Sequence, residues 1–183
     1  MVVSVMSVSP ERGPVLALRT PRFWLRLMNL SVVSQQYLDR IHVASEFINV
    51  KTPHDNQRLD DLRAYIAARE GRHDVLFLAI VNAESGKHIG IIKYEPVDVQ
   101  TGVAVMGILV GDQALRGKGL AGEVLLATAE WLKIHRAIHT IVLGVSVKNP
   151  AATRAYEKVG FVLEDTPLVV KSHPDQVLMV KRQ

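Results

Sequence analysis

Apolar and polar residues follow two different periods along this chain, and the change from one period to the other predicts the order of its elements. Apolar residues recur at helical spacing over 34–47, 55–70, 123–136 and 151–159, which predicts helices in these segments. Shorter β-rich runs, typical of strands, lie at 15–18, 24–28, 75–81, 88–94, 103–110, 140–147, 161–164 and 177–181. The run at 103–110 is apolar almost throughout, so we expect a central strand that is covered on both faces.

The order of these elements indicates one domain of the α/β (α+β) class. Two strands around the turn at 82–87 predict a hairpin, and the segment 103–147 reads as a strand, a helix and a strand. Together they predict a mixed sheet with helices on its faces. No linker rich in proline and glycine divides residues 15–183, and the apolar segment 1–14, which lacks a basic region, is expected to be a disordered leader.

Composition excludes several kinds of chemistry. The chain has no cysteine, which excludes disulfides, thiolate metal sites and a cysteine nucleophile, and which fits a cytoplasmic protein. A net charge of +4 suits an anionic ligand, but with 5% aromatic residues we expect no nucleic-acid partner. No apolar run is long enough to cross a membrane. His135 and His139 have a spacing that can bind metal, yet they lie at a helix end without a third ligand, so we predict no metal site.

A glycine-rich turn, LRGKGLAGEVL at 115–125, is the strongest candidate for ligand binding. Gly117 and Gly119 alternate with the cations Arg116 and Lys118 directly before a predicted helix. The start of a helix offers free backbone N–H groups and a positive dipole end, and glycine lets the backbone approach an anion closely. The turn therefore predicts a phosphate-binding site.

Two common phosphate-binding patterns do not fit this turn. Gly117, Gly119 and Gly122 spell the dinucleotide pattern G-x-G-x-x-G, but the next predicted strand ends in VSVKN, without the acidic residue that would hold a ribose. A P-loop requires serine or threonine after its lysine, whereas Gly119 follows Lys118, and Gly111 is one position out of place.

A third pattern fits. Arg116, Gly119 and Ala121 form R-x-x-G-x-A, which resembles the acetyl-CoA-binding signature Q/R-x-x-G-x-G/A of the GNAT family of N-acetyltransferases. The segment VSVKNPAATRAYEKVGF at 145–161 is similar to a second block of that family, through Asn149, Tyr156, Lys158, Gly160 and Phe161. Within the family, the chain looks most like ribosomal-protein N-terminal and amino-sugar acetyltransferases.

The resemblance implies a fold and a site for acetyl-CoA, the cosubstrate. The fold is a mixed, mostly antiparallel sheet in which two central parallel strands, here 103–110 and 140–147, splay apart. The pantetheine arm of acetyl-CoA would lie in the gap, and its pyrophosphate would bind the glycine turn. The residues implied in cofactor binding are Leu109, Val110, Arg116, Gly117, Lys118, Gly119, Leu120, Ala121, Asn149 and Tyr156.

The resemblance also implies direct attack of a primary amine on the acetyl thioester, with Tyr156 as proton donor to the leaving thiolate. The acceptor would be a small molecule or a peptide, and the family suggests a homodimer. Glu95 is the candidate general base; His42, Glu46, Asp98, Ser146 and a chain of water molecules are alternatives. Purely structural roles remain open for Asn149, as a helix N-cap before Pro150, and for Tyr156, as a packing residue. A non-catalytic acyl-CoA-binding domain is the alternative function.

Overall fold

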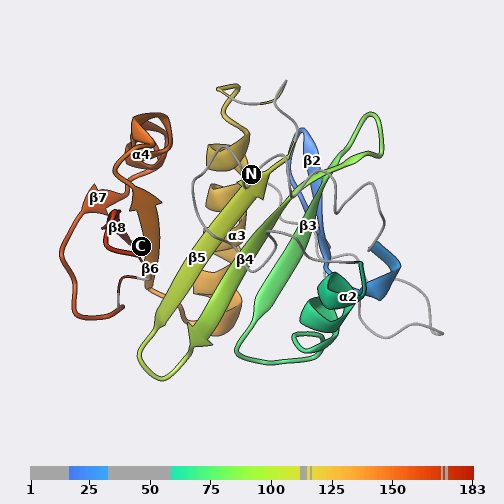
Figure 1. The fold of residues 1–183 in the computed structure, drawn as a ribbon, viewed down its shortest axis with the longest axis horizontal. Coiled ribbons are helices and arrows are strands. Elements are labelled where there is room, and N and C mark those ends of the chain that lie inside the picture. Colours follow the sequence, from blue (N-terminus) through green and yellow to red (C-terminus); the bar gives the residue numbers. More distant parts are fainter. Residues whose placement is uncertain (1–16, 33–58, 112–114, 116, 170, 172) are drawn as a thin grey trace.

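The computed structural model describes residues 17–32, 59–111, 115, 117–169, 171 and 173–183, which form one sheet with helices packed against it (Figure 1). The predicted helix at 34–47, the leader at 1–14 and the start of the helix predicted at 55–70 lie outside these residues. The elements are β1 (Ala17–Arg19), β2 (Phe23–Leu27), the 3-10 turn η1 (Leu30–Val32), α2 (Leu59–Ala67), β3 (Leu76–Asn82), β4 (His88–Asp98), β5 (Val103–Val110), α3 (Leu120–Arg136), β6 (Thr140–Ser146), α4 (Pro150–Glu157), β7 (Val162–Leu163) and β8 (Gln176–Arg182).

The eight described strands form one sheet in the order β1-β2-β3-β4-β5-β6-β8-β7. Strands β5 and β6 pair in parallel, and every other neighbouring pair in this sheet is antiparallel. The helix α3 connects the two parallel strands, as a βαβ unit requires. The prediction of a mixed, mostly antiparallel sheet is confirmed.

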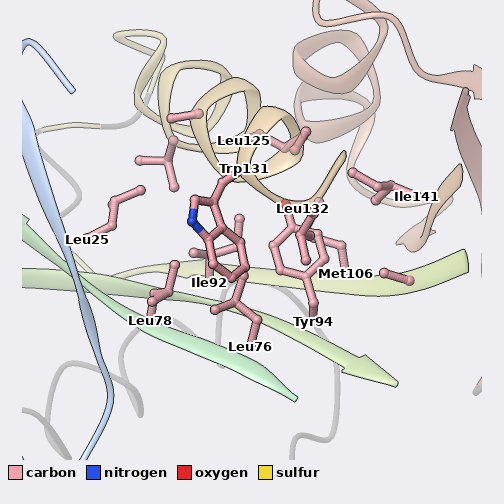
Figure 2. Close-up of a cluster of buried hydrophobic side chains, with 14 of the residues drawn as sticks. Leu25, Leu76, Leu78, Ile92, Tyr94, Met106, Leu125, Trp131, Leu132 and Ile141 are labelled. Atoms are coloured by element: carbon pink, nitrogen blue, oxygen red, sulfur yellow. The ribbon is translucent and has the colours of Figure 1, made fainter. Parts of the chain in front are cut away.

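The larger apolar cluster lies between α3 and one face of the sheet. Figure 2 shows Leu125, Trp131 and Leu132 of α3 above Ile92 and Tyr94, which extend from the sheet. The side chains of this cluster are almost completely buried, and each large one contributes roughly 1.5–3 kcal/mol to folding. The hydroxyl group of Tyr94 also lies inside this cluster.

A smaller apolar cluster lies on the other face, where α2 packs. Leu62 and Ile66 of α2 are each 1% exposed and meet Phe77 of β3 and Leu109 of β5. Among the described residues, α2 is the helix on this face, and it lies toward β3 (Figure 1). The two faces of the sheet therefore differ in how far the described helices cover them.

Three expectations require correction. Strand β4 continues past Tyr94 to Asp98, across a cis peptide bond between Glu95 and Pro96, and its pairing with β5 shifts register there. The prediction that 103–110 is covered on both faces holds only in part: on the α2 side of β5, Leu109 packs in the α2 cluster, but Val103 and Val105 are only half-buried and Gly107 is exposed. Helix α3 begins at Leu120, three residues earlier than expected, since Gly122 is accepted inside its first turn.

No helix in the described ranges is both long enough and apolar enough to span a membrane.

Candidate active site

The two parallel strands at the centre of the sheet pair over only part of their length. The parallel register runs from Val103 opposite Thr140 to Met106 opposite Leu143. Beyond that point β6 continues to pair with β8, and β5 continues to pair with β4, but β5 and β6 no longer pair with each other. The strands therefore diverge toward their C-terminal ends, as the family resemblance implies.

One hydrogen bond establishes which backbone groups of β5 face this opening. The Gly111 N–H donates to the Ile89 carbonyl oxygen at 2.9 Å, so Gly111 faces β4. Because the backbone groups of successive strand residues face opposite sides, those of Leu109 also face β4, and those of Ile108 and Val110 face away from it. No described strand pairs with β5 on that side, so Ile108 and Val110 offer open N–H and carbonyl groups. Of the two predicted contacts of the pantetheine arm, Val110 has open backbone groups and Leu109 has not, whereas those of Ile108, which was not predicted, are open.

The glycine turn presents further open N–H groups where α3 begins. Gly117 and Gly119 have φ angles of +72° and +74°, a conformation that side-chain-bearing residues rarely adopt. Gly119 is the N-cap residue of α3 and makes no side-chain capping bond. The first N–H groups of a helix lack intrahelical partners, so the amides of Leu120, Ala121 and Gly122 are available to an anion.

Charge beside this turn comes from Lys118, which is exposed. Arg116, the first residue of the predicted signature, lies outside the described residues. Of the predicted diphosphate ligands, the structure thus brings together the backbone of 117–121 and the side chain of Lys118 at one helix start.

Helix α4 lies beyond the end of β6 and packs against the first turn of α3 (Figure 1). A Cβ atom added to Gly122 would lie 3.0 Å from Cγ1 of Val159, so glycine allows the close approach of this segment. The side chain of Asn149 caps α4 by accepting a hydrogen bond from the Ala152 N–H at 3.1 Å, and Pro150 follows as the first helical residue. The capping role of Asn149 is confirmed, and its amide N–H₂ group has no partner among the described residues.

Tyr156 lies on α4 and packs against the same apolar cluster as Ile108 and Val110. Its ring centroid is 5.9 Å from that of Phe161. Desolvation by the surrounding side chains raises the pKa of Tyr156 to about 12. Its hydroxyl has no hydrogen-bond partner in the described part of the chain, so a protonated phenol remains available to donate.

Glu95, the predicted base, is surrounded by cations on the α2 side of β4. Its Oε2 accepts from Arg69 Nε and from Lys93 Nζ, each at 2.8 Å, and its Oε1 accepts from Arg72 Nη1 at 3.1 Å. Burial acts to raise the pKa of Glu95, but hydrogen bonds from Lys93 and Arg69 outweigh it and hold the pKa below its ordinary value. A carboxylate held in this way is a weak base. Ser146, one of the alternatives, is buried and accepts from the Lys148 N–H at 3.2 Å.

Two contacts of the site have no local signal in the sequence. Arg22, between β1 and β2, donates from Nη1 to the Lys118 carbonyl oxygen and from Nε to Glu123, across 96 and 101 positions. Arg69 and Arg72, which follow α2, likewise reach Glu95 from a distant part of the chain, whereas Lys93 stands two positions before it on β4. Co-variation of residue pairs among homologous sequences could indicate such contacts, and a single sequence does not contain that information.

Metal binding finds no support in the described ranges, where no group of three or more His, Asp or Glu side chains is placed to hold an ion. His135 instead contacts the Trp131 carbonyl oxygen through Nδ1 at 3.0 Å, and its ring stacks on that of Trp131.

Comparisons with known proteins agree with this geometry. Among solved structures, the chain is similar to the microcin C7 self immunity acetyltransferase MccE in complex with acetyl-CoA and AMP, with a TM-score of 0.77 and 18% identity over 97% of this chain and 99% of that one. It is similar to the RimL ribosomal L7/L12 alpha-N-protein acetyltransferase in complex with coenzyme A, with a TM-score of 0.75 and 14% identity over 89% and 95% of the two chains. It is also similar to the spermidine N-acetyltransferase from Vibrio cholerae in complex with CoA and spermine, with a TM-score of 0.73 and 18% identity over 90% and 97%.

At these identities the structural likeness shows the fold. No curated protein sequence matches the chain. The family is shown by a family model described as the acetyltransferase (GNAT) domain, which matches residues 23–162 and so covers most of the chain. The chain therefore belongs to the GNAT family of acetyltransferases, and the acetyl-CoA-dependent acetyl transfer expected from its sequence is the activity of that family.

Proposed function

We propose that this protein transfers the acetyl group of acetyl-CoA to a primary amine by direct attack, without an acetylated enzyme. The observation that carries the proposal is the opening between β5 and β6 beyond Met106 and Leu143, next to the glycine turn that starts α3. An amide-bearing arm and a diphosphate require these two features side by side: unpaired strand backbone and unpaired helix N–H groups.

In this proposal the described residues would contact the diphosphate and the pantetheine arm of acetyl-CoA. The amides of 119–122, with Lys118 beside them, would hold the diphosphate. The open N–H and carbonyl groups of Ile108, with the Val110 carbonyl oxygen, would bind the amides of the pantetheine arm, in the way that a further strand would. Asn149 would contribute its amide N–H₂ group, since its carbonyl oxygen already caps α4.

Acetyl-CoA supplies an activated acetyl thioester, and the protein has to position an amine and manage two protons. In the transfer, the nitrogen–carbon bond forms, the carbon–sulfur bond breaks, and the electron pair of that bond goes to sulfur. In this proposal the Val110 N–H would polarise the acetyl carbonyl oxygen, as in an oxyanion hole. The Tyr156 hydroxyl would donate its hydrogen bond to the sulfur as negative charge develops there.

Glu95 remains a prediction for the group that removes the amine proton, and the contacts of its carboxylate weigh against it. Both oxygens accept from cations, and the lowered pKa makes the carboxylate a poor proton acceptor. We therefore favour the alternative in which water molecules carry the proton to solvent, with Glu95 holding Lys93 and Arg69 in place.

The proposed acceptor class is a small molecule or peptide with a primary amine. The similar solved structures include proteins named for spermidine and for a ribosomal protein, both of which present amines. One spermidine N-acetyltransferase structure is described as dodecameric. A homodimer of this chain stays a prediction from its family.

The proposal is tested by measuring thiol release from acetyl-CoA with a panel of polyamines, amino sugars and N-terminal peptides. Release that depends on one class of amine supports the proposal and identifies the acceptor. CoA binding without turnover on any amine would favour the alternative, a non-catalytic acyl-CoA-binding domain. No binding of CoA by calorimetry would overturn both.

A further inference from the structure

Arg22, in the bend between β1 and β2, reaches the glycine turn from a distant part of the chain. Its Nη1 donates to the Lys118 carbonyl oxygen at 2.9 Å. Its Nε and its backbone N–H donate to the two carboxylate oxygens of Glu123, at 2.6 and 3.0 Å. The Arg22 carbonyl oxygen accepts from the Ala83 N–H at 2.9 Å, which ties the bend to the hairpin of β3 and β4. Arg22 thus connects the sheet to the start of α3.

The part of the turn that Arg22 contacts is otherwise easy to rotate. Lys118 stands between Gly117 and Gly119, and the missing Cβ atoms allow the intervening peptides to turn at low cost. A carbonyl oxygen rotated toward a bound anion would repel it, whereas an N–H attracts it. Because the peptide is planar and trans, holding the Lys118 carbonyl oxygen toward Arg22 directs the Gly119 N–H to the opposite side.

Arg22 also neutralises an acidic group at the same place. Glu123 lies in the first turn of α3, where its charge would oppose a diphosphate, and its side chain is only 16% exposed. Burial acts to raise the pKa of Glu123, but hydrogen bonds from Thr20 and Arg22 hold it below the ordinary value. The carboxylate is therefore ionised, and its charge needs the nearby guanidinium.

We propose that Arg22 is a positioning residue for acetyl-CoA, which fixes the Lys118–Gly119 peptide and neutralises Glu123 so that the turn accepts the diphosphate of the donor. The inference rests on the proposed function, in which this turn binds the diphosphate. It adds a residue that lies outside both sequence motifs, 96 positions before the residue whose carbonyl it binds.

Calorimetric titration with CoA tests the inference without an acceptor. Arg22→Ala removes the side-chain hydrogen bonds to Lys118 and to Glu123 and should raise the Kd for CoA about tenfold. Arg22→Lys can bind only one of the two partners at a time, so its Kd for CoA should lie between those of Arg22→Ala and the wild type. Adding Glu123→Gln to Arg22→Ala removes the unpaired charge and should recover part of the affinity. The control is Arg26→Ala, which removes the same charge from β2, where the guanidinium lies 6.0 Å from the Trp24 ring centroid.

A truncated donor separates positioning from a general loss of structure. With acetyl-CoA, Arg22→Ala should raise KM about tenfold and leave kcat at saturation within about twofold. With S-acetyl-pantetheine, which has no diphosphate, the ratio of kcat/KM between variant and wild type should be close to one. Equal losses with both donors would overturn the inference.

The outcomes distinguish failure of the proposed function from failure of the inference about Arg22. If the wild type does not bind CoA, the proposed function fails. If the wild type binds CoA and Arg22→Ala binds it equally well, only the inference about Arg22 fails. Should circular dichroism show that Arg22→Ala is unfolded, Arg22→Lys decides: an unchanged Kd for CoA overturns the inference, and a raised Kd supports it.

Discussion

Replacing Tyr156 by phenylalanine removes one hydroxyl group and leaves the ring in place against Phe161, 5.9 Å away between centroids. The hydroxyl makes no hydrogen bond to the described residues, so its removal should cost little folding stability. In the proposed mechanism the same hydroxyl faces the sulfur on which charge develops. Tyr156→Phe should therefore lower kcat and leave the melting temperature almost unchanged.

The raised pKa of Tyr156 decides the size of the expected loss. A thiol has a pKa of about 8.5, so complete transfer of a proton from a phenol with a pKa of about 12 is uphill by about 3.5 units, or about 5 kcal/mol. The phenol is thus better suited to donate a hydrogen bond to the thiolate than to lose its proton. A hydrogen bond to a charged group is worth about 1.5–3 kcal/mol, which corresponds to a loss in kcat of about 10- to 150-fold.

The assay is thiol release at saturating acetyl-CoA and amine, and Tyr94→Phe is the matched control. Tyr94 is completely buried, and its hydroxyl forms a hydrogen bond of 2.7 Å with Thr128 Oγ1, in the middle of α3 rather than at its start. We expect Tyr94→Phe to lose about 1 kcal/mol of stability and to keep its kcat. A Tyr156→Phe enzyme with kcat within about twofold of the wild type would refute the assignment of Tyr156.

The pH dependence follows from the same shift. The phenol stays protonated in the folded enzyme, so ionisation of Tyr156 should cause no fall in kcat from about pH 8 to about pH 10. The unfolded chain loses this proton near pH 10 and the folded chain near its raised pKa of about 12, so the tyrosine lowers stability only as the pH rises above about 10. A decline of kcat near pH 9 that disappears in Tyr156→Phe would contradict this account.

Substitutions at three further positions test the remaining parts of the site. Glu95→Gln leaves partly buried cations without their counter-ion and should lower stability by about 2 kcal/mol and the melting temperature by about 4–8 °C. We expect kcat to fall less than tenfold. A hundredfold loss of kcat in a fully folded variant would instead support Glu95 as the general base. Gly119→Ala places a side chain at a φ of +74°, which costs about 1 kcal/mol of backbone strain, and should therefore raise the KM for acetyl-CoA. An unchanged KM would argue against the turn as the diphosphate site. Asn149→Ala loses the cap of α4 and should lower stability by about 1 kcal/mol. Asn149→Asp keeps the capping oxygen and loses only the N–H₂ group, so a raised KM for acetyl-CoA in Asn149→Asp would report contact with the donor.

The local parts of the site could be read from the sequence because their chemistry depends on neighbours along the chain. Two glycines before an amphipathic helix define a turn with free N–H groups wherever the turn lies in the fold. Asn149 before Pro150 caps a helix for the same reason, and the cap is present. Strand β5 has the predicted bounds, because its apolar run ends at Gly111 on one side and begins after the turn at Gly102 on the other.

Long-range geometry explains what the sequence could not show. The covering of β5 depends on where α2 packs, and among the described residues of β5 the α2 cluster includes Leu109 but leaves Gly107 exposed. The start of α3 depends on Val159, which fits over Gly122 and makes glycine acceptable inside the helix. The environment of Glu95 depends on the segment after α2 meeting β4 on one side of the sheet, since this brings Arg69 and Lys93 onto the carboxylate of the predicted base.

By itself the sequence determined the family, the mixed sheet and the turn that offers its amides to an anion, since each follows from residue types at fixed spacing. Tertiary structure alone decided how long the parallel strands stay paired, which backbone groups of β5 face the opening, and how a distant arginine holds the turn. The physical reason is that hydrogen bonds and ion pairs act over a few ångströms in space, without regard to the 96 positions that separate Arg22 from Lys118.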